Sequence, residues 1–149
     1  MPHISGNITA WGPLINVIVG VSQPRAAALA RANQQLPSVV VAKLVVDTGA
    51  SQTSLDASIL QQLQIAPTGS TGIHTPSTQG VPHVVNLFDV SILIPGPNPA
   101  NPVAHVIPAI PVIEGQFRAQ GIDGLLGRDI LASTRFIYAG PDQIVLISF

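Results

Sequence analysis

Short runs of valine and isoleucine, interrupted at close intervals by proline or glycine, cover most of this sequence. The 149 residues include 14 prolines and 13 glycines, and sustained helical periodicity is rare. This pattern is typical of β-strands joined by turns and loops. We therefore expect a mainly β fold with one or two short helices, in one domain over residues 1–149.

Strands are expected where apolar residues gather between turn signals. They cover residues 14–22, 38–46, 83–95 and 103–115, a short stretch within 121–134 that runs into a helix, and a hairpin over 135–149 with its turn at 140–143. Two prolines in 103–115 favour an edge or irregular course. Residues 23–37 are a long excursion with one or two helical turns, and 96–102 a loop that proline keeps extended. Residues 54–65 are the best short helix, which Ser54 can cap.

Charged residues make up only 9% of the chain, 46% are apolar, and the net charge is −1. So few charges suggest that another chain covers part of the surface. No Lys/Arg cluster offers a footprint for nucleic acid or an anionic membrane. The absence of cysteine excludes disulfides and thiolate metal sites. No signal peptide or membrane helix is expected, because no apolar run approaches ~20 residues, so the cytoplasm is the default expectation.

Residues 43–56, KLVVDTGASQTSLD, end an apolar strand on a carboxylate, Asp47. Burial raises the pKa of a carboxyl group in general, which is one way to build a general acid or base. The Thr48 hydroxyl can lock a loop, Gly49 permits a tight turn with an accessible N–H, and the small Ala50 leaves room beside the carboxylate. Taken alone, Asp-Thr-Gly is also an ordinary turn sequence.

A second stretch, GIDGLLGRDIL at residues 121–131, places two leucines between glycines. Gly124 and Gly127 let backbones approach closely, and a helix is expected to follow Arg128. On its own this stretch indicates a buried strand followed by a helix N-terminus.

VVDTGAS, followed about eighty residues later by DGLLGRDIL in a small β-rich chain, resembles the retropepsin-like aspartic proteases, including their bacterial relatives. The resemblance covers residues 14–149, and the insertion at 23–37 is the clearest departure. It implies a single-lobe, closed β-barrel-like fold in which Asp47 is the catalytic aspartate. It also implies that Leu125, Leu126 and Gly127 pass beside the Asp47 loop and support it.

The resemblance assigns further residues to the active-site loop and its support: Thr48, Gly49, Ala50, Leu126, Gly127 and Arg128. Thr48 would brace two such loops, and Gly49 would offer a backbone donor near the carboxylates. Viral members often have an acid two places after the glycine that pairs with the arginine. Ser51 stands there in this chain, so Arg128 needs another partner. Asp129 is adjacent, but its direction stays open.

The resemblance places a flap that closes over substrate at about residues 68–81. Its candidate substrate-binding residues are Gly72, Ile73, His74 and Thr75. A plain surface loop over 66–82 is the alternative. The histidines at 74, 83 and 105 match no familiar metal-ligand spacing, so no metal or cofactor is expected.

Aspartic-protease chemistry needs two carboxylates that share one proton. The chain has a single Asp-Thr-Gly, because Asp56, Asp89, Asp123, Asp129 and Asp142 all lack the following Thr/Ser-Gly. A two-fold dimer in which two Asp47 side chains meet is the economical solution. The apolar residues 144–149 would make a poor exposed edge, so we place them in an inter-subunit sheet. Asp123 is either an active-site neighbour or a surface turn acid.

The leading hypothesis is a homodimeric aspartic endopeptidase that cleaves extended, apolar peptide segments. Its partners would be a second copy of the chain and a peptide or protein substrate. A non-proteolytic dimeric binding or assembly module on the same fold is the main alternative. A metal-dependent hydrolase that uses Asp47 and histidines is a weaker one.

Overall fold

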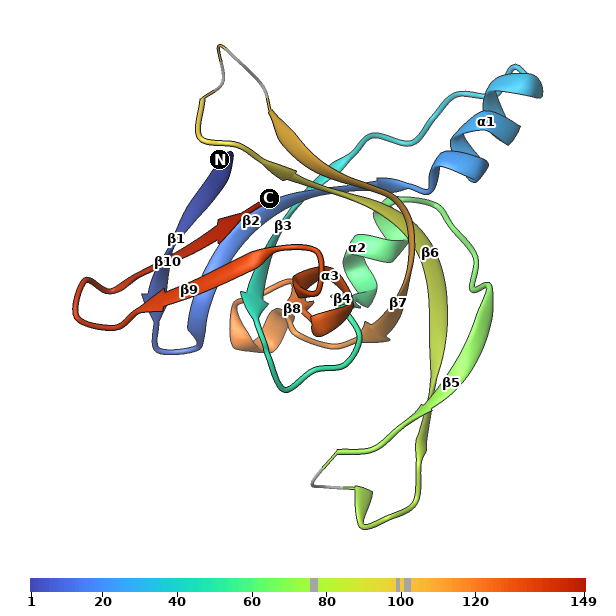
Figure 1. Cartoon of the computed structure of the whole chain (residues 1–149). Coiled ribbons are helices and arrows are strands. Elements are labelled where there is room, and N and C mark those ends of the chain that lie inside the picture. Colours follow the sequence, from blue (N-terminus) through green and yellow to red (C-terminus); the bar gives the residue numbers. More distant parts are fainter. Residues whose placement is uncertain (76–77, 99, 101–102) are drawn as a thin grey trace.

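A computed structural model describes residues 1–75, 78–98, 100 and 103–149. The elements it shows are β1 (His3–Thr9), β2 (Gly12–Val21), α1 (Gln23–Arg31), β3 (Val40–Val46), β4 (Ser54–Asp56), α2 (Ala57–Gln62), β5 (Gly69–Ile73), β6 (His83–Pro95), β7 (Ala104–Gly115), the 3-10 helix η2 (Arg118–Gln120), β8 (Gly124–Leu126), α3 (Arg128–Leu131), β9 (Arg135–Ala139) and β10 (Ile144–Ser148). The mainly β fold is confirmed, although the described residues contain three short α-helices (Figure 1).

Six of the described strands close into a barrel, in the order β2-β6-β7-β4-β8-β3 and back to β2. Neighbours are antiparallel except β3–β8 and β4–β7, which are parallel. The long strand β2 makes the closure possible. Its second half pairs with β6 over Ile18–Val21, its first half pairs with β1, and its other edge pairs with β3. The expected closed single-lobe barrel is therefore confirmed.

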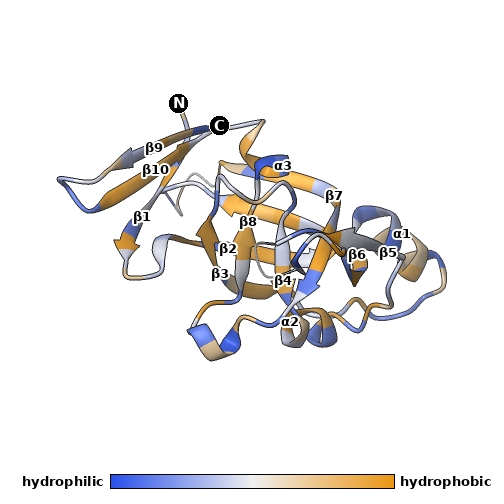
Figure 2. Cartoon of the chain, turned by 90° about the horizontal axis from the view of Figure 1, so that it is seen from below, coloured by the Kyte–Doolittle hydropathy of each residue, from blue (hydrophilic) through white to orange (hydrophobic). Residues whose placement is uncertain are grey.

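Alternation of inward and outward side chains along the barrel strands builds the core. On β2, Ile15, Val17 and Val19 are buried, whereas Asn16 points outward. Burying one such aliphatic side chain stabilises the fold by about 1.5–3 kcal/mol. Figure 2 shows the barrel strands β2, β3 and β8 coloured mainly as hydrophobic.

The helix expected over 54–65 begins later than the sequence pattern indicates. Ser54–Asp56 is instead strand β4, between β7 and β8. Asp56, not Ser54, caps α2, because its Oδ1 accepts a hydrogen bond from the N–H of Ser58 (2.9 Å). The excursion at 23–37 contains α1 in its first half, and α1 projects from the side of the barrel opposite the loop that follows β3 (Figure 1).

Residues 144–149 were expected to pair with a partner subunit in a shared sheet, but the structure pairs β10 within its own chain. β10 lies between β1 and β9 and is paired with both inside the chain, so it has no free edge to offer a partner. Strand β1, which the sequence pattern did not indicate, supplies the missing neighbour. The outer edge of this part of the sheet is β9.

The prolines of β7 agree with the expected edge position. β7 pairs with β6 along its length, but with β4 only over Ile113–Gly115, which leaves the segment carrying Pro108 and Pro111 paired on one side. The proline-rich loop expected at 96–102 includes residues 99, 101 and 102, which lie outside the described residues. In the described part of the chain, no helix has the length and apolar character that crossing a membrane requires.

Candidate active site

Strand β3 carries Asp47 out of the barrel at the point where the strand ends. Val46, the last strand residue, is buried, whereas Asp47 is half-buried. The N–H of Asp47 donates to the carbonyl of Leu126 (3.0 Å), which continues the parallel pairing of β3 and β8 by one residue. The N–H of Gly49 donates to Asp47 Oδ1 (2.8 Å), so the loop itself orients the carboxylate.

Residues 127 and 128 of the second motif hydrogen-bond to the rest of the loop that follows Asp47. The N–H of Arg128 donates to the carbonyl of Ala50 (2.9 Å), and the N–H of Gly127 donates to Thr53 Oγ1 (3.0 Å). A Cβ at Gly127 would lie 2.6 Å from the carbonyl carbon of Gln52, so only glycine allows this approach. The expected position of 125–127 beside the Asp47 loop is what the structure shows.

The direction of Asp129, which the sequence left open, is toward Thr53. Asp129 Oδ2 accepts the N–H of Thr53 (2.8 Å), and Oδ1 accepts its hydroxyl (2.7 Å). Thr53 is completely buried. Sequence reasoning missed Thr53, because nothing in the local pattern distinguishes it from other loop threonines.

Two of the residues that were expected to support the Asp47 loop have solvent-exposed side chains in the single chain. Thr48 and Arg128 are both exposed. Within the described residues, neither side chain makes a hydrogen bond or ion pair with another residue. Arg128 therefore acts on the loop through its backbone N–H in this chain.

A cleft of about 430 Å³ opens beside Asp47. Its described lining residues are Asp47, Gly49, Ala50, Ser51, Gln52, Ser54, Ile73, His74, Thr75, Ile113, Glu114, Gly115, Phe117 and Leu125. Three of the four flap candidates belong to this lining, and Gly72 does not. Gly72 instead packs on Pro82, since a Cβ there would lie 2.8 Å from Pro82 Cβ.

The segment expected as a flap is a hairpin. β5 and β6 pair antiparallel from Gly69–Leu87 to Ile73–His83. Figure 1 shows the loop after β3 and the far end of the β5–β6 hairpin on the same side of the barrel. Residues 76 and 77 of the expected flap lie outside the described residues.

The histidines do not gather around Asp47. His74 lines the cleft, His83 begins β6, and His105 stacks on Phe149 (5.3 Å between ring centroids) and contacts Ser133 Oγ (3.0 Å). Among the described residues, no group of three side chains is suited to hold a metal ion.

Glu114 is the second carboxylate among the described lining residues of the cleft. Its Oε2 accepts a hydrogen bond from Asn86 Nδ2 (2.8 Å). The sequence did not indicate a second acid at this place, since Glu114 lies near the end of an apolar strand and belongs to no motif.

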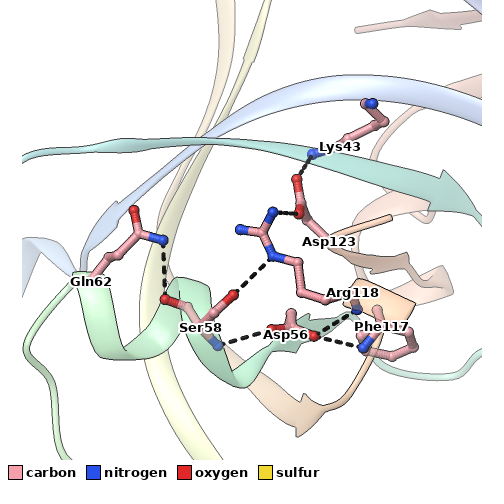
Figure 3. A network of polar contacts seen from close by, with 7 residues as sticks. All are labelled: Lys43, Asp56, Ser58, Gln62, Phe117, Arg118 and Asp123. Atoms are coloured by element: carbon pink, nitrogen blue, oxygen red, sulfur yellow. Dashed lines mark hydrogen bonds and ion pairs between the residues drawn. The ribbon is translucent and has the colours of Figure 1, made fainter. Parts of the chain in front are cut away.

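A buried carboxylate, Asp56, contacts the backbone of Phe117, one of the residues that line the cleft (Figure 3). Burial by itself raises the pKa of Asp56. Hydrogen bonds from the N–H of Phe117, from the side chain and N–H of Ser58 and from the N–H of Arg118 outweigh burial and lower the pKa from 3.8 to about 2. Asp123, left open between active site and surface turn, belongs to this network and not to the cleft lining.

The closed barrel, the Asp-Thr-Gly loop beside a cleft and the supporting strand define the scaffold of an aspartic protease. The family model described as "Aspartyl protease" matches residues 30–130, and the chain belongs to this aspartyl protease family of peptide hydrolases. A retropepsin-like aspartic protease from Rickettsia conorii, known from a crystal structure, has the same fold at 19% sequence identity. The TM-score is 0.61, with 99% of this chain and 90% of that chain covered. No curated protein sequence matches the chain.

Proposed function

We propose that residues 1–149 form one domain that acts as half of a homodimeric aspartic endopeptidase. Each subunit would contribute one Asp47 to a shared site. The observation that carries this proposal is a cleft built around a single Asp-Thr-Gly loop whose Thr48 side chain stays exposed. A partner's loop, related by a two-fold axis, would supply the second carboxylate and contact Thr48.

In this mechanism the two Asp47 carboxyls share one proton, because like charges about 3 Å apart do not both ionise easily. The ionised carboxyl takes a proton from the attacking water. The protonated one donates a hydrogen bond to the scissile carbonyl and stabilises the developing oxyanion. Gly49 contributes by holding Asp47 Oδ1 through its N–H. Ala50, Leu126, Gly127 and Arg128 act as supports of the loop.

Glu114 is the only rival for the second carboxylate among the described lining residues of the cleft. Its hydrogen bond with Asn86 favours a structural role on β7. An active site within one chain would need Glu114 to face Asp47, whereas a shared site does not.

The proposed substrate is an extended peptide with apolar side chains. Ile73, Ile113, Phe117 and Leu125 give the cleft apolar walls. The hairpin β5–β6 would act as a flap, with Gly72, Ile73, His74 and Thr75 near the substrate. Extended peptides bind such sites through backbone hydrogen bonds, with alternate side chains in flanking pockets.

The test is cleavage of an unfolded apolar protein at mildly acid pH by wild type, Asp47→Asn and Glu114→Gln. Asp47→Asn keeps the size of the side chain and removes the titratable group, so cleavage should fall by at least ~10²–10⁴-fold while folding and dimerisation persist. Glu114→Gln should retain cleavage. Loss of cleavage in Glu114→Gln as well as in Asp47→Asn would favour a site within one chain. A wild-type dimer that binds the protein without cleaving it would favour a binding module.

A further inference from the structure

Phe117, which lines the cleft, is held through its backbone by Asp56, which does not line it. Figure 3 shows this contact. Asp56 Oδ2 accepts the N–H of Phe117 (2.6 Å) and the N–H of Arg118 (3.0 Å). Its Oδ1 accepts the N–H of Ser58, the cap of α2. Asp56 is only 5% exposed, so these three N–H groups take the place of water around its charge.

Phe117 takes up a defined position on this support. Its ring lies against the backbone of Gly115, where an added Cβ would overlap the ring. Phe117 and Gly115 both line the cleft that contains Asp47. The residue whose N–H binds Asp56 is therefore also the residue whose ring lines the cleft.

The same network joins this part of the cleft lining to the strand that carries Asp47. Arg118 Nε donates to Ser58 Oγ (3.0 Å), and Arg118 Nη1 pairs with Asp123 Oδ1 (3.0 Å). Asp123 Oδ2 accepts the N–H of Lys43 (2.8 Å), and the N–H of Asp123 donates to the carbonyl of Lys43 (2.8 Å). Lys43 belongs to β3, and Asp47 directly follows this strand.

We propose that Asp56 is a positioning residue, which fixes Phe117 relative to Asp47 and thereby sets which substrate side chain the cleft accepts beside the scissile bond. This inference rests on the proposed proteolytic function and adds a specificity determinant to it. Phe117 is the residue that would touch substrate, and Asp56 acts through it.

The support persists in acid. The hydrogen bonds from Phe117, Ser58 and Arg118 outweigh burial and lower the pKa of Asp56 to about 2, so this carboxylate stays ionised at mildly acid pH. The charged groups of the network that surrounds it are Arg118 and Asp123, which pair with each other.

The experiment uses two peptides that differ only in one residue next to the cleaved bond, leucine or alanine. The kcat and KM values are measured for wild type, Asp56→Asn, Phe117→Ala and the double variant. Asn is uncharged and offers one acceptor oxygen in place of two. In wild type Oδ2 serves the N–H groups of Phe117 and Arg118 and Oδ1 serves the N–H of Ser58, so in Asp56→Asn one side of this arrangement loses its acceptor and the other keeps a weaker, uncharged one. Asp142→Asn, a neutralisation in the exposed turn between β9 and β10, is the matched control.

We expect Phe117→Ala and Asp56→Asn each to lower the preference for leucine by ~10-fold, mainly through KM, since a pocket contact of this size sets such ratios. The double variant should match Phe117→Ala, because both changes act on one wall. Asp142→Asn should keep the wild-type preference. Equal loss on both peptides in Asp56→Asn, with the preference unchanged, would overturn the inference while the protease proposal stands.

A second measurement does not depend on cleavage. Hydrogen exchange at the amides of Phe117 and Arg118 should be slow in wild type and faster in Asp56→Asn, with exchange along β3 unchanged. Unchanged exchange at 117 and 118 would overturn the positioning role. A wild-type chain that cleaves neither peptide would overturn the inference together with the protease proposal.

Discussion

Thr53 and Asp129 are joined by two hydrogen bonds, from the N–H and the hydroxyl of Thr53 to the two carboxylate oxygens of Asp129. The pair links the Asp47 loop to the helix that follows the second motif. The same hydroxyl accepts the N–H of Gly127 (3.0 Å), so one buried oxygen serves both motifs. The loop that carries Asp47 is held at its far end by this pair.

Thr53→Val should therefore be costly although the two side chains are similar in size. It leaves the N–H of Gly127 without its acceptor and removes one donor to Asp129, which costs about 1–3 kcal/mol of unfolding free energy. Urea denaturation measures the change. Thr53→Ser, which keeps the hydroxyl, is the control and should recover most of the stability. Equal losses in both variants would show that the methyl group matters more than the hydrogen bonds.

If each subunit holds half a site, specific activity should fall on dilution below the dimer dissociation constant. Sedimentation velocity across the same concentrations should show the dimer content falling in parallel. A specific activity that is independent of concentration in a verified monomer would contradict the shared site.

The edge strand β9 is the place to test the dimer surface, because β10 is paired on both sides within the chain. Ile137 on β9 is 53% exposed, although it is apolar. Ile137→Lys should weaken the dimer by about tenfold, equivalent to about 1.4 kcal/mol. Leu36→Lys, at an exposed apolar residue between α1 and β3, should leave the dimer unchanged. Equal effects of the two substitutions would place the interface elsewhere.

The depressed pKa of Asp56, about 2 against 3.8 for the ordinary carboxyl, predicts a specific acid sensitivity. The folded state holds this carboxylate ionised, so its contribution to stability is fully present above about pH 4 and is lost as the pH falls toward 2. The contribution is of the order of 2 kcal/mol. The difference in unfolding free energy between wild type and Asp56→Asn should accordingly shrink between pH 5 and pH 2. A constant difference over this range would contradict the assignment.

The flap assignment predicts different effects at two glycines of the same strand. Gly72→Ala should lower turnover without weakening the dimer, because its Cβ would lie 2.8 Å from Pro82 and displace the hairpin. Gly69→Ala should be nearly neutral to turnover, since a Cβ there meets nothing within 4 Å. Hydrogen exchange over 69–75 should slow when a peptide mimic binds. Unchanged protection there would make the hairpin a surface feature only.

The parts of the fold that depend on local residue patterns could be predicted from the sequence. Runs of Val and Ile between turn residues located most strands. The family resemblance that the two motifs carry, and not their local pattern, implied that 125–127 lies beside the Asp47 loop. Strand β1 escaped notice because Ser5, Gly6 and Asn7 have low strand propensity, and its pairing with β10 stabilises it. Strand β4 was wrongly predicted as the first turn of a helix, since Leu55 fits the buried face of either a helix or a short strand.

The supports of the site could not be predicted, because they depend on contacts between distant residues. Asp56 contacts Phe117 and Arg118 some sixty residues later in the chain. Asp129 contacts Thr53 across a separation of 76 residues. An acid beside a leucine, as Asp56 is, or beside an isoleucine, as Asp129 is, carries no local sign of such a partner.

The pairing of β1 with β10 brings the two ends of the chain together. The N–H of Phe149 donates to the carbonyl of Pro2 (3.1 Å), and both termini lie at the same place in the fold (Figure 1). A short linker could therefore join residues 1 and 149, and new ends could be opened in the exposed connection between α1 and β3. Such a circular permutant would keep every strand pairing in the described residues. The order in which the strands are synthesised is thus separable from the architecture that holds Asp47.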